Sequence, residues 1–156
     1  MRHDYPMIKN SCSSETMKIQ LNRLDQLIGY HLRRAQNFVF EDFVKSIGDD
    51  AITPGQFGVL SVIFENQGLN QSTLAKTIGI ERSTMVGVID TLEKRGIVVR
   101  KRSEIDKRSY GLQLSPTGKD LLNRVEKKVS DHEQRLSANL TAKERSQLIK
   151  LLKKIG

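Results

Sequence analysis

The stretch between residues 70 and 114 constrains the fold most, because two helix patterns and two strand patterns follow one another there without interruption. Helical spacing of apolar residues predicts a short helix over 71–78 and a second helix over 82–95, each followed by a glycine that ends it. Two strand-like runs then occupy 97–102 and 109–114, with a charged loop between them. Helix, tight turn, helix and hairpin, in this order, predict a winged helix-turn-helix.

Further helix patterns flank this unit on both sides. Apolar residues recur at steps of three and four between about 17 and 47, which predicts a long amphipathic helix, either continuous or broken near Gly29. A minimal strand at Leu69 is expected to pair with the hairpin. Helix starts are predicted from capping residues, with proline at the first helical position in two cases, at 53–56, 115–116 and 141–144.

The flanking helices carry more apolar surface than one chain can cover, since a winged helix already closes its own small core. Burying these faces against a second copy stabilises them by about 25 cal/mol per Å2. We therefore expect a two-fold homodimer and a mainly α fold, with an α+β winged helix at its centre. The predicted organisation is a mobile arm over 1–16 and one domain over 17–156, in which the winged helix takes about 53–115 and the dimerisation helices about 17–47 and 116–155.

The composition narrows the class of protein. The 156 residues are 37% hydrophobic and 28% charged, which is typical of a globular protein, and no apolar run has the length of a membrane span. The net charge of +8 favours a polyanionic partner, although charge alone does not separate DNA from RNA, a membrane or heparin. Cys12 is the single cysteine, and no signal-peptide pattern precedes it. We expect a soluble, cytoplasmic protein.

The early part of the second helix is the segment that a helix-turn-helix inserts into the major groove of DNA. Arg82 can pair with a guanine edge or a phosphate. Ser83 and Thr84 can donate to phosphates, and Val86 can touch a thymine methyl. Gly87 has two interpretations: a close approach of the backbone to DNA, or tight packing against a neighbouring helix.

The hairpin is strongly basic. Asp106 and Arg108 are two residues apart, so the carboxylate can hold the guanidinium in position for a minor groove. The alternative is a solvated hairpin tip without a partner. Five cations fall within nine residues, namely Arg100, Lys101, Arg102, Lys107 and Arg108. All of them except Lys101 are predicted DNA contacts, and so is Asp106.

These motifs together resemble the MarR family of bacterial transcriptional regulators. They are, in order, TPGQFGVL at 53–60, LAKTIG at 74–79, RST at 82–84 with DTLEKRG at 90–96, DKR at 106–108 and LSPTG at 114–118. The resemblance covers roughly residues 20–155. It implies a homodimeric winged-helix repressor of palindromic operator DNA, whose D-x-R wing motif falls on Asp106 and Arg108. Gly87 departs from the polar or basic residue that many members carry there.

The resemblance also implies a small ligand, often a phenolic or aromatic acid, bound between the dimerisation helices and the winged helix. The middle of the first helix is unusually polar and aromatic for a dimer seam. Arg33 or Arg34 can match a carboxylate with its planar fork, and His31 or Tyr30 can bond a phenol; salt bridges between subunits are the alternative. This stretch is similar to repressors of hydroxycinnamate and related aromatic-acid catabolism, whose effector is the acid or its thioester. The predicted ligand residues are Tyr30, His31, Arg33, Arg34, Phe38 and Phe57.

Other functions have weaker support in the sequence. The three histidines lie far apart, and no nucleophile, metal-ligand or phosphate-loop spacing occurs, so we expect neither catalytic residues nor a metal or cofactor. A redox-sensing repressor would use Cys12, but its polar surroundings offer no group to stabilise a thiolate. A constitutive DNA-architectural protein without a ligand is the other alternative.

Overall fold

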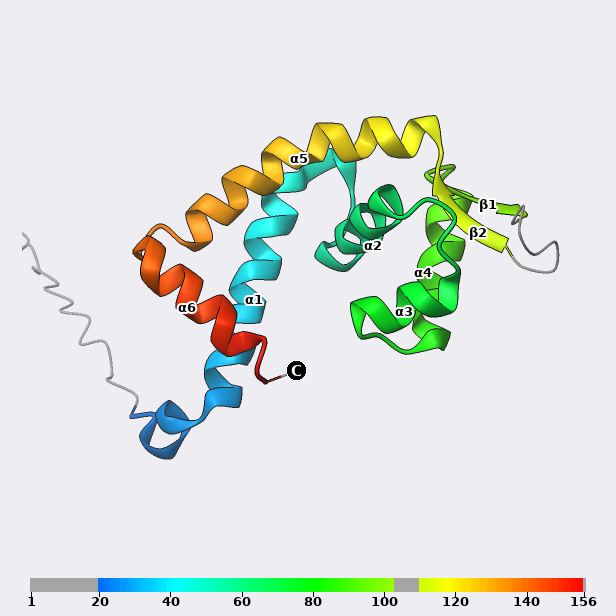
Figure 1. Ribbon diagram of the computed structural model, residues 1–156. Helices are drawn as coiled ribbons and strands as arrows, with labels where there is room; N and C mark the ends of the chain where they lie inside the picture. The colour runs from blue at the N-terminus through cyan, green and yellow to red at the C-terminus, as the bar shows by residue number, and fades with distance from the viewer. Residues whose placement is uncertain (1–19, 103–109, 156) are drawn as a thin grey trace, which may run out of the picture. The chain divides into compact units, whose positions relative to one another are not determined.

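The computed structural model describes residues 20–102 and 110–155, which belong to two compact units, Met1–Arg34 and Ala35–Gly156. The predicted arm over 1–16, with Cys12, lies outside the described residues. Helices and strands follow in the order η1 (Asn22–Gln26), α1 (Ile28–Ile47), η2 (Gly48–Asp50), α2 (Pro54–Glu65), α3 (Gln71–Ile78), α4 (Arg82–Lys94), β1 (Val98–Arg102), β2 (Tyr110–Leu114), α5 (Pro116–Leu136) and α6 (Ala142–Leu152). The predicted mainly α fold with a winged helix is confirmed (Figure 1).

The long first helix is not continuous in its N-terminal part. A 3-10 helix over Asn22–Gln26 comes first, and the α-helix begins only at Ile28. The interruption falls at Leu27, whose backbone is extended, with φ −92° and ψ 119°. Gly29 is therefore inside the helix, and the predicted break near it lies two residues earlier.

Capping side chains start the helices where the sequence predicts them. The hydroxyl of Thr53 accepts from the amide of Gln56, and the Gln56 side chain accepts from the Thr53 amide, which completes a capping box at α2. Thr141 and Glu144 form the same box at α6. Ser115 accepts from the third residue of α5. These bonds satisfy amides that have no partner within the helix.

The two strands pair antiparallel, from Val98 opposite Leu114 to Arg102 opposite Tyr110. Leu69 forms a bridge with Leu112 of β2, with both backbone hydrogen bonds at 2.9 Å, from Leu112 N–H to Leu69 O and from Gly68 N–H to Leu112 O. The predicted minimal strand is thus confirmed. It ties the hairpin to the connection between α2 and α3.

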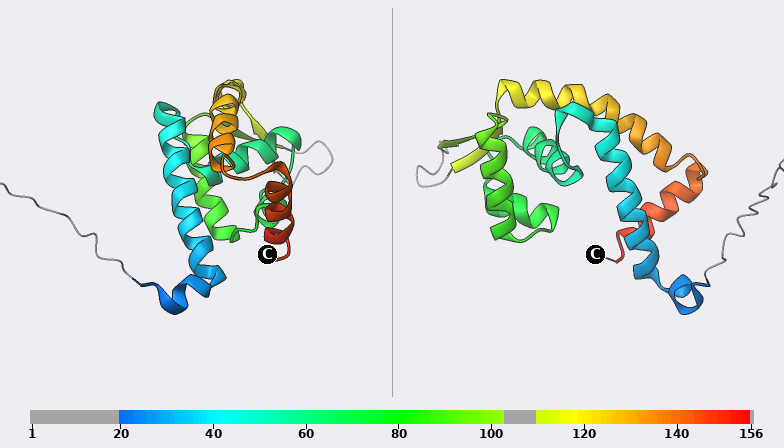
Figure 2. Two further views of the ribbon diagram at one scale, coloured as in Figure 1. Left: turned by 90° about the vertical axis from the view of Figure 1, so that its left-hand side faces the viewer. Right: turned by 180° about the vertical axis from the view of Figure 1, so that it is seen from behind.

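The core lies where α2, α3, α4, the hairpin and the first half of α5 meet. In Figures 1 and 2, α3 and α4 lie beside each other, and α5 passes over α2. Met85, Ile89 and Leu92 of α4 recur at steps of four and three and are fully buried, which fixes the inward face of this helix, while Val88 is half-buried. The other fully buried side chains are Ile47, Val59, Leu60, Ile63, Leu74, Val98, Leu112 and Val125.

The C-terminal helix α6 contributes no buried residue to the described core. No residue of α6 is buried against the rest of the described chain, although its apolar residues form a row along one side. In α1, Phe43 and Ile47 are buried, but the helix also exposes large apolar side chains. The exposed ones in α1 and from α6 onward are Ile28, Leu32, Phe38, Phe40, Val44, Leu148, Ile149, Leu151, Leu152 and Ile155. Over the ranges described, none of the helices is long and apolar enough to cross a membrane.

Candidate DNA interface and ligand cavity

The first turns of α4 present a continuous exposed face. Buried Met85 and Ile89 fix the rotation of the helix in the core. Helical periodicity then turns the intervening positions outward. The structure places all five predicted contacts of this helix on the exposed side: Arg82, Ser83, Thr84, Val86 and Gly87.

Gly87 is not required by packing within the chain. A Cβ added there would meet no described atom within 4 Å. Tight packing against a neighbouring helix of the same chain, one of the two interpretations of this glycine, therefore has no support among the described residues. A helix that lacks side-chain bulk on its exposed face can approach another surface more closely.

Arg100 of β1 faces the protein rather than solvent. Its guanidinium forms ion pairs with Asp90 at 2.7 Å and with Glu93, both on α4, and contacts the Gln71 side chain of α3 at 3.4 Å. The Arg100 side chain is only 30% exposed. Both terminal nitrogens of the guanidinium bond to the protein, so in the structure Arg100 joins the hairpin to both helices of the helix-turn-helix.

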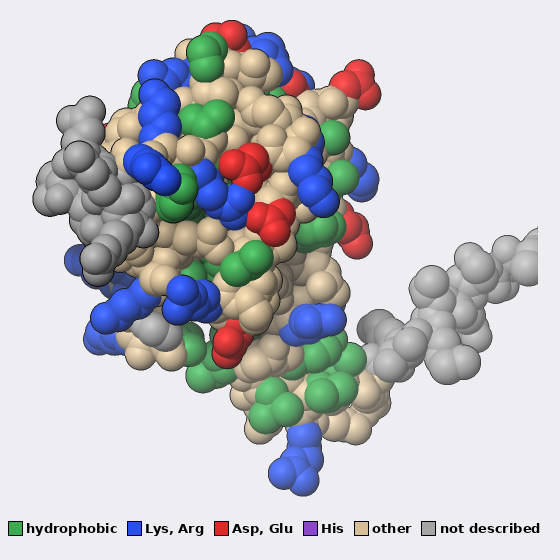
Figure 3. Space-filling model, turned by 90° about the vertical axis from the view of Figure 1, so that its right-hand side faces the viewer, with side chains coloured by type: hydrophobic (Ala, Val, Ile, Leu, Met, Phe, Trp, Pro, Cys, Tyr) green, Lys and Arg blue, Asp and Glu red, His purple; other side chains and the backbone are tan. Residues whose placement is uncertain are grey.

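Two other cations of β1, Lys101 and Arg102, are exposed. Arg102 lies opposite Tyr110, and a hydrogen bond between these side chains raises the pKa of Arg102 above its usual value. Figure 3 looks onto the side of the hairpin and α4, where many Lys and Arg side chains are exposed. The remaining predicted wing contacts, Asp106, Lys107 and Arg108, lie outside the described residues.

A cavity of about 170 Å3 opens between α2 and α5. Phe57, Phe64 and Leu122 supply its apolar lining, and the polar lining consists of Ser61, Glu65, Asn123 and Glu126. Phe57 also contacts the core through Phe43, with the ring centroids 6.1 Å apart. Phe57 is thus the predicted ligand residue that lines this cavity.

Phe38, another predicted ligand residue, is not part of this lining. Phe38 is 59% exposed on α1. Tyr30, His31, Arg33 and Arg34 belong to the first compact unit and are half-buried or exposed there. Within that unit the Arg34 guanidinium lies over the Tyr30 ring at 5.7 Å and donates to its hydroxyl at 3.4 Å, and His31 Nε2 is 2.7 Å from the carbonyl of Asp25.

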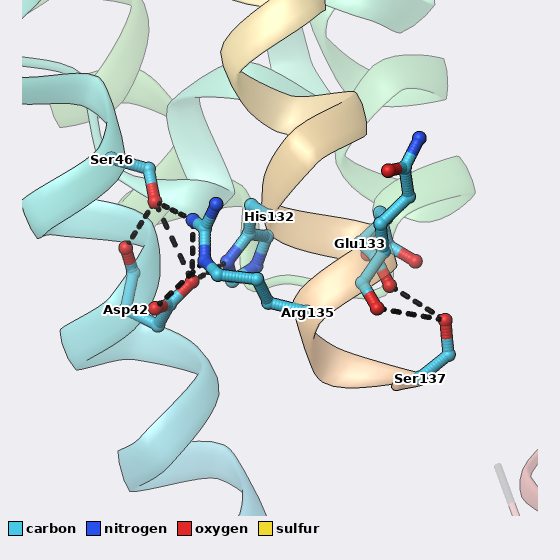
Figure 4. A network of polar contacts seen from close by, with 7 residues as sticks. Asp42, Ser46, His132, Glu133, Arg135 and Ser137 are labelled. Carbon is cyan, nitrogen blue, oxygen red and sulfur yellow. Dashed lines mark hydrogen bonds and ion pairs between the residues drawn. The ribbon is translucent and has the colours of Figure 1, made fainter. Parts of the chain in front are cut away.

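Figure 4 shows a polar network between α1 and α5 that no sequence pattern indicates. His132, 2% exposed, bonds through Nδ1 to the Asp42 carboxylate at 2.6 Å and meets the Phe43 ring edge-on at 5.4 Å. Arg135 donates to the same carboxylate at 2.9 Å and to the Ser46 hydroxyl. The bonds from Arg135 and then from His132 lower the pKa of Asp42 to about 2.

A second set of contacts gathers at the α1–α2 junction. Asp50 pairs with Lys128 at 2.7 Å and Arg124 at 3.3 Å, both on α5. The hydrogen bond from Lys128 is the main cause that lowers the Asp50 pKa. Arg95, at the end of α4, donates to the carbonyls of Ala51 at 2.8 Å and Asp50. The junction therefore contacts both the C-terminal end of α4 and α5. No set of three or more potential metal ligands occurs among the residues that the structure describes.

Comparison with known proteins agrees with this geometry. Residues 52–110 match the model of the MarR family. A Thauera aromatica protein named for transcriptional regulation of the hcr operon is 42% identical over 129 residues, 82% of this chain and 78% of that protein. The transcriptional repressor CouR bound to a 23-mer DNA duplex is 41% identical, with a TM-score of 0.83 over 88% of this chain and 98% of that one. CouR bound to p-coumaroyl-CoA is 40% identical, with a TM-score of 0.81 over 88% and 97%.

Proposed function

Because the chain belongs to the MarR family of transcriptional regulators, we propose that it is a repressor that a small aromatic effector releases from operator DNA. The exposed face of α4 carries the proposal: polar, apolar and cationic groups suited to DNA stand outward on a helix whose other side is locked in the core. The protein is proposed to act in the cytoplasm, where the operator lies.

The DNA-bound form is proposed to be a homodimer on palindromic DNA. Apolar side chains exposed on α1 and α6 supply the surface that a second copy covers. Two-fold symmetry then places two α4 helices in successive major grooves, roughly 34–36 Å apart. Arg82, Ser83 and Thr84 contact base edges and phosphates, with Val86 and Gly87 closest to the groove floor. Arg102, with Asp106, Lys107 and Arg108 of the loop, serves the neighbouring backbone or minor groove.

The effector is proposed to be an aromatic acid such as a hydroxycinnamate, or its thioester. This follows from the similarity to CouR, which binds p-coumaroyl-CoA, and from the aromatic cavity between α2 and α5. Tyr30, His31, Arg33, Arg34 and Phe38 remain proposed ligand residues beside Phe57. The dimer is proposed to have two conformations, one with the α4 helices spaced for DNA and one with them spaced wrongly. A ligand that binds the second conformation more tightly by about 1–3 kcal/mol weakens operator binding roughly 5- to 150-fold.

Fluorescence anisotropy with a labelled duplex from the promoter next to the gene tests this function. The dimer should bind that duplex far more tightly than a scrambled duplex, and p-coumarate or p-coumaroyl-CoA should weaken the binding. Arg82→Ala should weaken operator binding, whereas Lys143→Ala, a cation on α6 away from the recognition helix, should not. Equal affinity for both duplexes would instead indicate an architectural protein.

Replacing the two predicted carboxylate anchors separately tests the effector side. One of the two variants, Arg33→Ala or Arg34→Ala, should no longer respond to the effector. Its affinity for DNA in the absence of the effector should stay unchanged. If both variants release DNA at the same effector concentration as the native chain, neither arginine holds the carboxylate.

A further inference from the structure

The cavity between α2 and α5 has the size and walls of a slot for one aromatic ring. Its volume is about 170 Å3, and Phe57, Phe64 and Leu122 form its apolar surface. An apolar protein cavity of about 150 Å3 is large enough to hold benzene. The cavity is therefore large enough for the ring of a hydroxycinnamate and too small for a whole coenzyme thioester.

The polar lining of the cavity accepts hydrogen bonds but carries no cation. Ser61 uses its hydroxyl hydrogen on the carbonyl of Phe57 at 2.9 Å, which leaves its oxygen as an acceptor. Glu65 and Glu126 contribute carboxylates, and neither takes part in an ion pair between residues that the structure describes. Asn123 is the only side chain of the lining with N–H donors.

A carboxylate entering this slot would approach two negative charges with no described cation in the lining to compensate for it. A phenol differs, because its hydroxyl is neutral and donates a hydrogen bond. Donation to a carboxylate is charge-assisted and about twice as strong as a bond between neutral groups. The lining therefore favours the hydroxyl end of a hydroxycinnamate over its carboxyl end.

We propose that this cavity binds the phenol end of the effector, with the hydroxyl donating to Glu65 or Glu126 and the acyl end directed out of the slot. The inference rests on the proposed function and specifies its ligand class: a para-hydroxylated aromatic acyl compound, bound hydroxyl first. Glu65 and Glu126 are then the residues that select for the ring hydroxyl. The acyl end outside the slot is free to be a carboxylate or a thioester.

Isothermal titration with two matched pairs of compounds tests the proposal. The pairs are p-coumarate with cinnamate and p-coumaroyl-CoA with cinnamoyl-CoA, and each pair differs only by the ring hydroxyl. In the pair that binds, the hydroxylated compound should bind about 10- to 100-fold more tightly, as expected for a hydrogen bond to a charged group. The double variant Glu65→Gln/Glu126→Gln should reduce this preference to about 3- to 10-fold, because a bond to a neutral acceptor is about half as strong.

The single variants Glu65→Gln and Glu126→Gln show which carboxylate accepts the hydrogen bond from the phenol. The control is Glu41→Gln, which changes an exposed glutamate of α1 outside the cavity lining and should keep the full preference for the hydroxylated compound. Affinity for the compound without the hydroxyl should stay the same in every variant, which separates a lost contact from a misfolded cavity.

Three results would overturn the proposal, and they differ in what else they affect. Equal affinity for both members of the binding pair removes the phenol contact but leaves an effector-responsive repressor. Tighter binding of cinnamate by the double variant means that a carboxylate enters the slot. If none of the four compounds binds while the protein still binds its operator, the proposed effector class is wrong as well.

Discussion

Replacing Arg100 by alanine distinguishes a cation that joins parts of the protein from one that contacts DNA phosphates. Arg100 is paired with Asp90 and Glu93, and all three side chains are between 30% and 46% exposed. Ion pairs this exposed contribute about 0.2–1 kcal/mol each, so we expect a loss of about 1 kcal/mol of stability per chain. If the hairpin must then be ordered on DNA in both chains, the operator affinity of the dimer falls by about 2 kcal/mol, or roughly thirtyfold.

The salt dependence of binding provides the distinction. Each phosphate contact adds about 0.9 to the slope of log affinity against log salt concentration. Arg102→Ala removes an exposed cation of the same strand from both chains, so the slope should fall by about 1.8, which changes affinity about twelvefold over a fourfold range of salt. Arg100→Ala should weaken binding with the slope unchanged. Anisotropy titrations between 50 and 200 mM salt, with Lys101→Ala as a second exposed control, measure both quantities.

The opposite slope result would refute this reasoning. If Arg100→Ala flattens the slope as much as Arg102→Ala does, Arg100 leaves its carboxylate partners and contacts phosphate in the complex. The double variant Asp90→Asn/Glu93→Gln gives an independent reading. It should also weaken binding, because it breaks the same ion pairs, whereas tighter binding would show that these carboxylates only repel DNA.

Three further outcomes are expected. Sedimentation at micromolar concentration should give about twice 17.7 kDa, and a monomer that still binds palindromic DNA tightly would contradict the dimer. Gly118→Ala should strongly destabilise the fold in urea denaturation, because its Cβ would overlap the carbonyl oxygen of Ile97; a native midpoint would show that this contact can relax. The lowered pKa of Asp42 predicts stability that is complete above the ordinary carboxyl pKa near 4 and is lost as pH falls toward about 2; Asp42→Asn should lower the melting temperature at pH 7 and remove this part of the acid dependence.

Local patterns in the sequence predicted the elements of the fold well. The boxes at Thr53 and Thr141 and the start at Ser115 are confirmed, because a cap bonds to an amide only a few residues away. The buried face of α4 follows from helical periodicity alone, because Met85, Ile89 and Leu92 recur at steps of four and three. The break was predicted near Gly29, because glycine has a low helix propensity, but it lies at Leu27. Helix propensity is only a weak guide to where a helix begins.

The polar contacts were harder to predict, since they join residues distant in the chain. His132 and Asp42 are ninety positions apart, and nothing in either neighbourhood indicates the other. In the sequence, Arg100 resembles the other cations of the hairpin, which are predicted to contact DNA. A usable signal was nevertheless present: Asp90 and Glu93 are three residues apart on α4, so they share a helix face directed toward the strand that follows. The acidic lining of the cavity likewise depends on the packing of α2 against α5.

The bare apolar row of α6 has a consequence for genetics. In the proposed dimer, pairing and DNA contact lie on different helices, so a chain altered only in α4 should still associate with native chains. Such mixed dimers present one competent half to a palindrome that requires two, and at equal expression most dimers would contain a defective chain. Mutations on the exposed face of α4 should therefore be dominant in cells that carry both alleles. Mutations that replace Leu148 or Leu152 with charged residues should be recessive, because the altered chain no longer forms dimers with native chains.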